Sequence, residues 1–414
     1  MNNLSSKEDS AKSENNSPSF IEAKCLLEYM WEQRCYFHSH PELGLKEFET
    51  CNRIEQELKA LGLSPYRVGQ TNVIAEIDSG RPGKTLFLRA DIDALPVQEE
   101  NNVPYKSQNS GIMHACGHDG HAAYLLGTAR LLLNHKADFS GKVILCFQAA
   151  EEIGKGARQI IEAGVLDKVD RTFGIHFQAG MEVGKIGVKT GADMASCDRI
   201  KIKIHGKAAH ITRPQDGVDS VFIASLIVAK LHTVVSRVIS PVEGAILGIG
   251  SIHSGTTYNI IAGEAEIEGT IRTFSAESRK KLAEKVEKIA KNTAEEFGGR
   301  AEVEIEDICD PCTNPKETAA EVVESAKKIT APENVITDLE KRFGSDNFAD
   351  YSRKAPGTYV HVGSSDSEKN SWPHHNEHFD LAKESLAYAA ALALQYSLDY
   401  LNKSLQKNAF DRLV

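Results

Sequence analysis

Residues 142–154 read KVILCFQAAEEIG, an apolar stretch of strand length that runs directly into two glutamates. Adjacent side chains of a strand point to opposite faces of a sheet, so Glu151 and Glu152 can share a site only where the strand ends and the chain turns. Gly154 and Gly156 supply such a turn. In open α/β sheets, ligands lie at the carboxyl ends of strands. The segment predicts a buried strand that ends in a functional carboxylate pair, although two solvated loop glutamates explain it equally well in isolation.

Similar strand-like segments flank this one along the chain. They cover residues 72–77 (NVIAEI), 85–88 (TLFL), 172–176 (TFGIH) and, near the C-terminus, 359–362 (YVHV). Helical patterns cover residues 20–61, with an interruption at Pro41, then 120–134 and 381–400. Because strands alternate with helices, we expect a largely parallel sheet covered by helices on both faces.

The stretch from about residue 196 to 306 has a different pattern. Residues 199–205 (RIKIKIH) alternate strictly between polar and apolar side chains, as in a strand with one face in water. A helix (219–237), two strands (244–254 and 264–274), a second helix (276–298) and a last strand (300–306) follow. This βαββαβ order is typical of a ferredoxin-like unit. The sheet face that carries Lys201 and Lys203 is expected either to stay open or to pair with another chain.

The predicted fold is therefore α/β: a mixed, mostly parallel sheet forms a main domain, and a ferredoxin-like lid domain is inserted into it. We expect a disordered tail over residues 1–19, the main domain over 20–195 and 308–414, and the inserted lid over 196–307. A chain of this length is sufficient for two or three domains.

Composition narrows the class of protein. The chain has 414 residues and carries 48 Lys and Arg against 58 Asp and Glu; the net charge of −10 argues against a nucleic-acid partner. No apolar run approaches the roughly 20 residues that span a bilayer, and the polar N-terminal residues contain no apolar signal segment. The 8 cysteines are scattered, as in a protein with reduced thiols. These features predict a cytoplasmic protein without a membrane partner.

The densest group of chemically active side chains is HACGHDGH, residues 114–121. Gly117 and Gly120 predict a loop, with the helix starting after it, and in a loop Cys116 and His118 can converge on one metal ion. Asp119 could accept a hydrogen bond from an imidazole ligand. The alternative is a buried cysteine beside surface histidines, but the density of ligand-type residues favours metal binding.

Other candidates also follow strands or stand in the lid. Asp91 and Asp93 follow TLFL and could orient ligands, bind a metal or cap a helix; His176 ends TFGIH and is by itself more typical of a packed histidine. A second histidine cluster, HHNEHFD, covers residues 374–380. In the lid, His210 ends GKAAH, and Asn259 and Arg272 flank a strand. An arginine on a buried face would suit a substrate carboxylate, although a surface position is the default.

These motifs together resemble a known family. The segments are FHSHPELGLKEFET, LRADIDALPVQEE, MHACGHDGHAA, FQAAEEIGKGAR, GIHF, HGKAAH, NIIAGEAEIEGTIRTF and HHNEHFD. In this order they resemble the dinuclear metallo-aminoacylase and carboxypeptidase family, and best its branch of N-acyl-amino-acid amidohydrolases, which includes hippurate hydrolases and plant auxin-conjugate hydrolases. The similarity covers nearly the whole chain after the tail.

The resemblance implies a catalytic main domain with two divalent metal ions, Mn²⁺ or Zn²⁺, and a lid that commonly forms a homodimer. By position, the implied metal ligands are Cys116, His118, Glu152, His176 and His375. Glu151 is the implied general base. His210 is implied to polarise the scissile carbonyl, often across the dimer, and Asn259 and Arg272 to hold the carboxylate end of a small-molecule substrate.

Two departures from the family pattern stand out. The C-terminal motif is usually His-x-Pro-x-Phe, and here Glu377 occupies the proline position. Counting back from Phe379 selects His375 as the ligand, with His374 as the rival. The usual Gly-Ser-Glu-Asp-Phe is replaced by GSDNF at residues 344–348, which predicts a changed local pocket.

The predicted activity is hydrolysis of the amide bond of N-acyl-L-amino acids by water that is activated by metal, with a glutamate base. A dipeptidase or carboxypeptidase of the same family is the first alternative. A catalytically inactive, metal-binding dimeric scaffold is the second, and a hydrolase with Cys116 as nucleophile is the third.

Overall fold

The computed structural model describes residues 17–410. The first helix, α1 (Pro18–Cys25), begins two residues before the predicted start of the main domain at residue 20, because the side chain of Ser17 accepts a hydrogen bond from the Phe20 N–H and caps it. The rest of the predicted tail, residues 1–16, lies outside the described residues.

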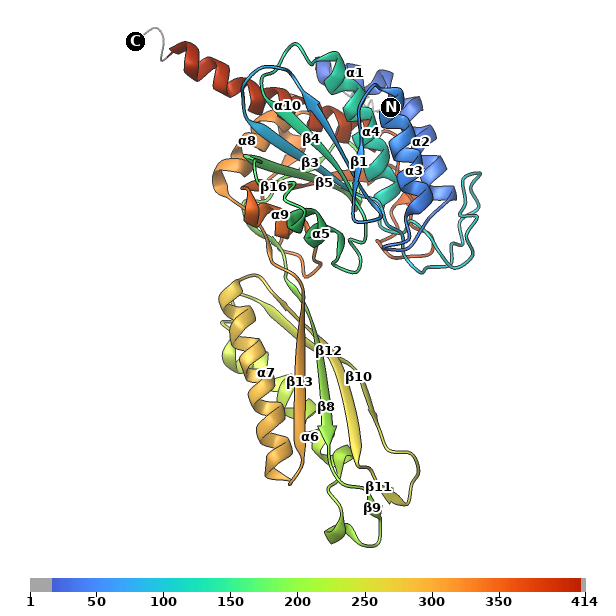
Figure 1. Ribbon diagram of the computed structural model, residues 1–414, viewed down its shortest axis with the longest axis vertical. Helices are drawn as coiled ribbons and strands as arrows, with labels where there is room; N and C mark the ends of the chain where they lie inside the picture. Colours follow the sequence, from blue (N-terminus) through green and yellow to red (C-terminus); the bar gives the residue numbers. More distant parts are fainter. Residues whose placement is uncertain (1–16, 411–414) are drawn as a thin grey trace, which may run out of the picture.

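An eight-stranded sheet forms the main domain, in the upper half of Figure 1. Its order is β1 (Tyr66–Val68), β2 (Asn72–Asp78), β4 (Lys142–Gln148), β3 (Thr85–Asp91), β5 (Arg171–Glu182), β16 (Gly357–Ser365), β6 (Ile186–Gly187) and β15 (Val335–Ile336). The central strands β4, β3, β5 and β16 are parallel to one another. β2 is antiparallel to β1 and β4, and β6 is antiparallel to β16. The prediction of a mixed, mostly parallel sheet is confirmed.

Two apolar layers pack on the two faces of this sheet. One layer contains α1, α2 (Leu27–Ser39), α3 (Phe48–Ala60), α4 (His118–Asn134), α8 (Lys316–Ala326) and α10 (Ser385–Phe410). The other contains α5 (Gly156–Glu162) and α9 (Phe348–Lys354). Alternate strand residues feed the two layers: Leu86 and Leu88 belong to the first and Phe87 to the second. The uninterrupted apolar strands of the sequence follow from burial on both faces.

The inserted lid has the predicted βαββαβ order. It consists of β8 (Cys197–His205), α6 (Ser220–Val238), β10 (Ala245–Ser254), β12 (Glu264–Thr273), α7 (Ala276–Glu296) and β13 (Arg300–Cys309). The antiparallel sheet order β10-β12-β8-β13 is that of a ferredoxin-like unit. Ile200, Ile202 and Ile204 of β8 face the two helices. On the other face, Lys201 pairs with Glu266 of β12 at 3.0 Å.

The two parts meet at a narrow connection in Figure 1. There β7 (Gly191–Met194) pairs with β14 (Cys312–Asn314), just outside the lid strands that leave from and return to the main domain. At the far tip of the lid, β9 (Ala209–His210) pairs with β11 (Ile260–Ile261). The domain boundaries at residues 195 and 307 remain predictions.

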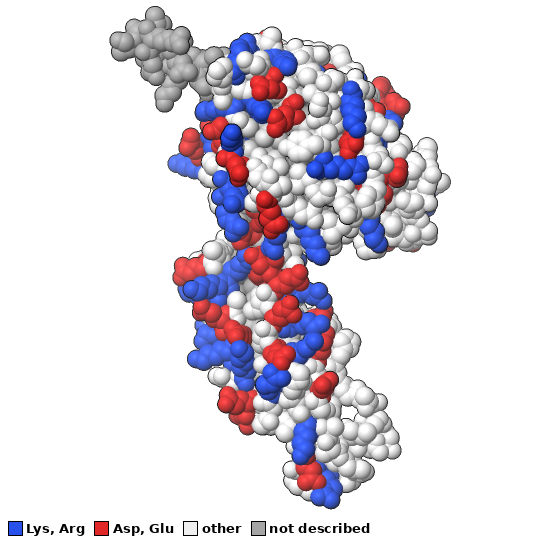
Figure 2. Space-filling model, in the orientation of Figure 1, with Lys and Arg blue, Asp and Glu red and all other residues white. Residues whose placement is uncertain are grey.

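Helix α6 is, among residues 17–410, the one helix that is long and apolar enough to cross a membrane by length and composition. Only 28% of its most apolar window is buried, yet Ile223, Ile227 and Leu231 pack on the lid sheet. Its outer side exposes Val221 and Phe222, each 46% accessible. On the face shown in Figure 2, Lys and Arg side chains are interspersed with Asp and Glu over the lid.

Candidate active site

The site lies at the carboxyl ends of the central parallel strands. β3 ends at Asp91, β4 ends at Gln148, three residues before Glu151, and His176 stands on β5. The strand-end rule placed the carboxylates correctly, because parallel strands bring their carboxyl ends to one edge of a sheet. The prediction that His176 ends its strand is wrong: it lies in the interior of β5, which continues to Glu182.

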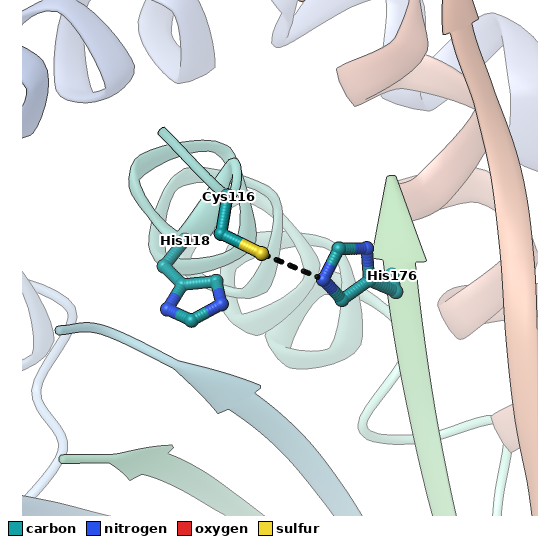
Figure 3. A group of neighbouring side chains, drawn as sticks. All are labelled: Cys116, His118 and His176. Atoms are coloured by element: carbon teal, nitrogen blue, oxygen red, sulfur yellow. Dashed lines mark hydrogen bonds between the residues drawn. The ribbon is translucent and has the colours of Figure 1, made fainter. Parts of the chain in front are cut away.

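Three of the predicted metal ligands converge from two elements (Figure 3). Cys116 Sγ lies 3.5 Å from His176 Nε2, and the ligand atoms of Cys116, His118 and His176 all lie within 4.8 Å of one another. Gly117 adopts φ 89°, a left-handed conformation that glycine tolerates, and this bend separates the cysteine from the helix. The prediction that α4 starts after the cluster is wrong: His118 is its first residue, since Gly117 alone makes the turn.

Hydrogen bonds orient two of these imidazoles. His118 Nδ1 donates to the Asp93 carbonyl oxygen at 2.9 Å, and His176 Nδ1 donates to the Phe177 carbonyl oxygen at 2.7 Å. Each ring therefore keeps an unprotonated Nε2 when it is neutral, and that lone pair is the one a metal ion needs. Asp93 also accepts from the Glu152 N–H at 3.0 Å, so one side chain contacts both predicted ligands.

Asp119 does not serve a predicted ligand. Its carboxylate accepts a hydrogen bond from His38 Nδ1 at 2.7 Å and pairs with Arg34 Nε at 2.8 Å, in a fully buried group. These contacts lower the pKa of Asp119, although burial alone would raise it. Asp119 thus anchors α4 to α2. Asp93 instead orients a predicted ligand, the role that the sequence suggested for Asp119.

His375 completes a second group with Cys116 and Glu152, whose ligand atoms lie within 4.8 Å of one another. His375 Nε2 lies 3.4 Å from Glu152 Oε1. The backbone of His375 adopts φ 65°, and its N–H donates to the Ala115 carbonyl at 2.7 Å, which fixes it beside the cysteine. The rival His374 instead directs Nε2 to the Phe177 carbonyl oxygen at 3.0 Å.

The two neighbouring glutamates occupy different environments. Burial raises the pKa of Glu151 well above its usual range, and the charges of Asp346 and Glu152 add to the effect. Burial acts the same way on Glu152, but His375 and His118 outweigh it and lower the pKa. The Asn347 N–H donates to Glu151 Oε1 at 3.2 Å. One carboxylate therefore favours the charged form, and its neighbour favours binding a proton.

A buried network beneath the site holds Asp91. Arg89 pairs with Asp91 at 2.6 Å and with Asp346 at 3.0 Å. Burial alone would raise the pKa of Asp91, but the charge of Arg89 and the neighbouring His118 and His121 outweigh it and lower the pKa. His121 donates from Nδ1 to Asp91 and accepts from the Phe177 N–H at Nε2. Both nitrogens of His121 are therefore used, so this ring has no free lone pair for a metal ion.

The donors fit a pair of divalent cations. Cys116 belongs to both three-residue groups, and within residues 17–410 Glu152 Oε1 is a buried oxygen without a hydrogen-bond partner. Burial raises the pKa of the Cys116 thiol, and Glu152 adds to this. A nearby cation acts in the opposite sense and favours the thiolate. Imidazole, thiolate and carboxylate together suit borderline metals.

The predicted lid residues fall into two separate places. His210 and Asn259 lie at the distal tip, where the Ile211 N–H donates to the Asn259 carbonyl. Arg272 lies at the other end of β12 and donates from Nη1 to Ser345 Oγ of the main domain at 2.7 Å. The eight residue-to-residue steps from Glu264 to Arg272 span about 26 Å of strand. Within one chain, Asn259 and Arg272 are not brought together.

A local hydrogen bond sets which nitrogen of His210 can donate. It is exposed, and its Nδ1 accepts a hydrogen bond from the Thr212 N–H at 3.2 Å. In the neutral ring the proton then stands on Nε2, where it can be given to an oxyanion. The imidazole is oriented for the predicted role, but at a distance from Glu151 in the same chain.

A polar group beside His176 was missed by the sequence interpretation. It consists of Gln178, Asp193, Arg342 and His361, which come from four separate segments. Its arginine stands two residues before GSDNF, the segment that departs from the family pattern. That departure was the only signal in the sequence.

An open α/β sheet with an inserted lid and Cys, His and Glu donors at its strand ends has the features of a metal-dependent hydrolase. The sequence model of peptidase family M20/M25/M40 matches residues 87–398, and the chain belongs to this family. The resemblance drawn from the motifs is confirmed.

Relatives agree with this assignment. The N-acetylcysteine deacetylase of Bacillus subtilis (strain 168) is 39% identical over 355 residues, which are 85% of this chain and 92% of that protein. Thermostable carboxypeptidase 1 of Saccharolobus solfataricus is 36% identical over 384 residues, covering 91% and 97%. The crystal structure of a dinuclear metal-binding M20 peptidase from Bacillus subtilis has a TM-score of 0.79 at 34% identity, covering 92% of this chain and 99% of that one.

Proposed function

We propose that this protein hydrolyses the amide bond of N-acyl-L-amino acids. The observation that carries the proposal is the pair Glu151 and Glu152 at the end of β4: one favours a proton and the other points toward Cys116 and His375. A water-activating hydrolase needs such a base next to its metal ligands. The similarity to a deacetylase of an N-acetylated amino acid supports the same substrate class.

Two divalent cations, Mn²⁺ or Zn²⁺, are proposed to be held by Cys116, His118, Glu152, His176 and His375. When bound, such a pair supplies Lewis acidity that acidifies water and polarises a carbonyl. The family similarity to a dinuclear metal-binding peptidase and the two groups that share Cys116 support this count.

The chain's own residues then carry the proton transfer. Glu151 takes the proton of the attacking water, and the Asn347 N–H that binds its Oε1 fixes the position of the carboxylate. Its raised pKa lets it keep that proton until the leaving amine accepts it. Arg272 is proposed to bind the carboxylate of the amino acid, and His210 to donate to the oxyanion from Nε2.

The distance of the lid tip from Glu151 supports the proposal of a second copy of the chain. His210 and Asn259 lie at the lid tip, so they are proposed to reach the site of the partner subunit of a homodimer. Val221 and Phe222 on α6 and Ile252 on β10 are exposed apolar side chains of the lid, and Ile252 is 47% accessible. β10 is an edge strand of the lid sheet and could pair with another strand.

All eight cysteines are free, which supports the proposed cytoplasmic location.

The test is a panel of N-acetyl- and N-benzoyl-L-amino acids against unmodified dipeptides, with added Mn²⁺ or Zn²⁺. Hydrolysis of the N-acyl compounds, abolished by a chelator and restored by metal, is expected. Activity that persists after complete metal removal would point to Cys116 as a nucleophile. If the metal-loaded protein hydrolyses no amide, the hypothesis of a catalytically inactive metal-binding scaffold is the one that remains.

A carboxypeptidase is the second candidate, because a thermostable carboxypeptidase shares 36% identity over nearly its whole length. Both activities use the same base and the same carboxylate-binding arginine. They differ on the acyl side, where a dipeptide carries a free amino group. Faster cleavage of dipeptides than of their N-acetylated counterparts would favour the peptidase.

A further inference from the structure

Arg342 is a partly buried cation with no carboxylate paired to it. Its Nη1 donates to Gln178 Oε1 and lies 3.2 Å from His361 Nδ1. Across residues 17–410, no Asp or Glu oxygen lies within 4.0 Å of its guanidinium nitrogens. Burial lowers its pKa, although the more distant charge of Asp193 acts in the opposite direction. Buried charges in proteins are normally paired, so this guanidinium is expected to meet an anion from outside the chain.

The neighbours of Arg342 hold its guanidinium in place through neutral acceptors and do not neutralise its charge. An arginine N–H can only donate, so His361 Nδ1 accepts and His361 Nε2 carries the proton. That Nε2–H donates to Asp193 Oδ2 at 2.8 Å, and both His361 and Asp193 are buried. The Asp193 carboxylate is therefore partnered by the imidazole, which separates it from the guanidinium. The group holds a cation in place and leaves part of its donor capacity unused.

Arg342 lies near the proposed metal ligands. His361 stands beside His176 in the register of β16 and β5, and Gln178 follows His176 on the same face of β5. Two residues of a strand span about 7 Å, so the guanidinium lies within the length of a small substrate from a proposed metal ligand.

The loop of residues 342–347 joins this arginine to the rest of the site. Ser345 accepts a hydrogen bond from Arg272, and the Asn347 N–H donates to Glu151. The loop is anchored because the Ala195 N–H donates to the carbonyl oxygens of Arg342 and Gly344. One short segment therefore sets the spacing between the proposed base and two cationic side chains.

We propose that Arg342 binds a second carboxylate of the substrate, so that the preferred substrates are N-acyl amino acids with two acidic groups. This inference rests on the proposed amidohydrolase activity, in which Arg272 takes the first carboxylate. The second carboxylate can belong to the amino acid, as in an N-acyl-glutamate, or to the acyl group, as in an N-succinyl compound.

The test compares matched substrates on the metal-loaded protein. N-acetyl-L-glutamate is set against N-acetyl-L-glutamine, and N-succinyl-L-methionine against N-butanoyl-L-methionine. A charge-assisted contact predicts that kcat/KM is higher for one acidic member by about tenfold to a hundredfold. The pair that shows the preference identifies which part of the substrate carries the carboxylate.

Variants assign the preference to this side chain. Arg342→Gln is expected to bring the acidic-to-neutral ratio to about one, and Arg342→Lys to retain part of it. Lys341→Gln is the matched control: it removes the neighbouring cation, which binds the Glu243 carbonyl on the lid, and should keep the ratio.

The outcomes separate the two claims. If no N-acyl amino acid is hydrolysed, the proposed function fails. If they are hydrolysed in a metal-dependent way but neither acidic member is preferred, the role of Arg342 fails alone. The same holds if Arg342→Gln lowers both members of a pair equally and also lowers the melting temperature, because that result describes a structural contact.

Discussion

The main domain and the lid tip present their functional side chains in opposite ways. Asp91, Asp93 and His118 are at most 1% accessible and are bonded to one another or to backbone, whereas Tyr258, next to Asn259, is 94% accessible. Burial makes a site rigid and raises the energetic consequence of each contact. The buried half of the candidate site is therefore assembled within one chain, whereas the exposed lid tip is proposed to act on a partner subunit.

The lid also has a hydrophobic core of its own. Its helices and sheet bury an independent apolar cluster that includes Ile202, Ile223 and Leu282. A rigid unit joined through a narrow connection can carry His210 to a partner as one body. The comparison predicts that changes in the main domain act within one chain, and that changes at the lid tip act between chains.

The largest effect is expected for Glu151→Gln. Loss of a general base costs about a hundredfold to ten-thousandfold in rate. We expect kcat to fall at least a thousandfold with metal content unchanged, measured on the best N-acyl substrate. Glu162→Gln, an exposed glutamate on neighbouring α5, is the control and should retain full activity. Undiminished turnover of the Glu151 variant would remove the base assignment.

His210→Ala tests the other half of the comparison. Removing one oxyanion donor costs about a hundredfold to a thousandfold in kcat. The sharper experiment mixes this variant with Glu151→Gln and lets subunits exchange. In a mixed dimer, one site combines an intact Glu151 with the partner's intact His210, so activity should return.

Recovery in that mixture depends on the site crossing the interface. If His210 acted in its own chain, every site of the mixed dimer would lack one group and activity would stay low. A monomer in solution at working concentrations would contradict the shared site directly.

Asp93→Ala should weaken metal binding without removing a ligand. Asp93 contacts both His118 and the Glu152 N–H, and such orienting contacts are worth about tenfold to a hundredfold in metal affinity. Competition with a chromogenic chelator measures the change. Asp78→Asn, an exposed aspartate at the end of β2, should leave the affinity unchanged. Equal affinities for the Asp93 variant and the wild type would mean that the backbone alone positions these ligands.

Strand patterns and strand-end rules predicted much of this molecule. KVILCF and TFGIH became central strands, and RIKIKIH became β8, because burial on one or two faces leaves a direct mark on residue order. Cys116 and His176 are 60 residues apart, and the topology of the parallel sheet is what brought them within 3.5 Å.

The rest depended on contacts that no local pattern encodes. Sequence could not show that Asp119 binds Arg34 and His38, since α2 and α4 meet only after folding. It could not show Arg342 against His361 for the same reason. The separation of Asn259 from Arg272 follows from the length of β12. The number of residues between them already indicated this distance, but the resemblance implied that both hold the same end of the substrate.

The smallest effect is expected at His135, which is neither deeply buried nor part of the site. Burial lowers its pKa, but hydrogen bonds from Nε2 to Glu22 at 2.8 Å and from Nδ1 to Asp138 at 2.7 Å outweigh this and raise it. A raised histidine pKa stabilises the fold at low pH, and this contribution is lost as pH rises through the folded pKa.

Because both carboxylates are at least 37% accessible, solvent screening limits the contribution to less than about 1 kcal/mol. His135→Gln should lower the free energy of unfolding at pH 5.5 more than at pH 8.5, measured by urea denaturation at both values. This effect should be smaller than that of Asp93→Ala, because Asp93 is buried and burial strengthens each contact. A loss at His135 of several kcal/mol, or one that is larger at pH 8.5, would show that exposure does not govern the size of these effects.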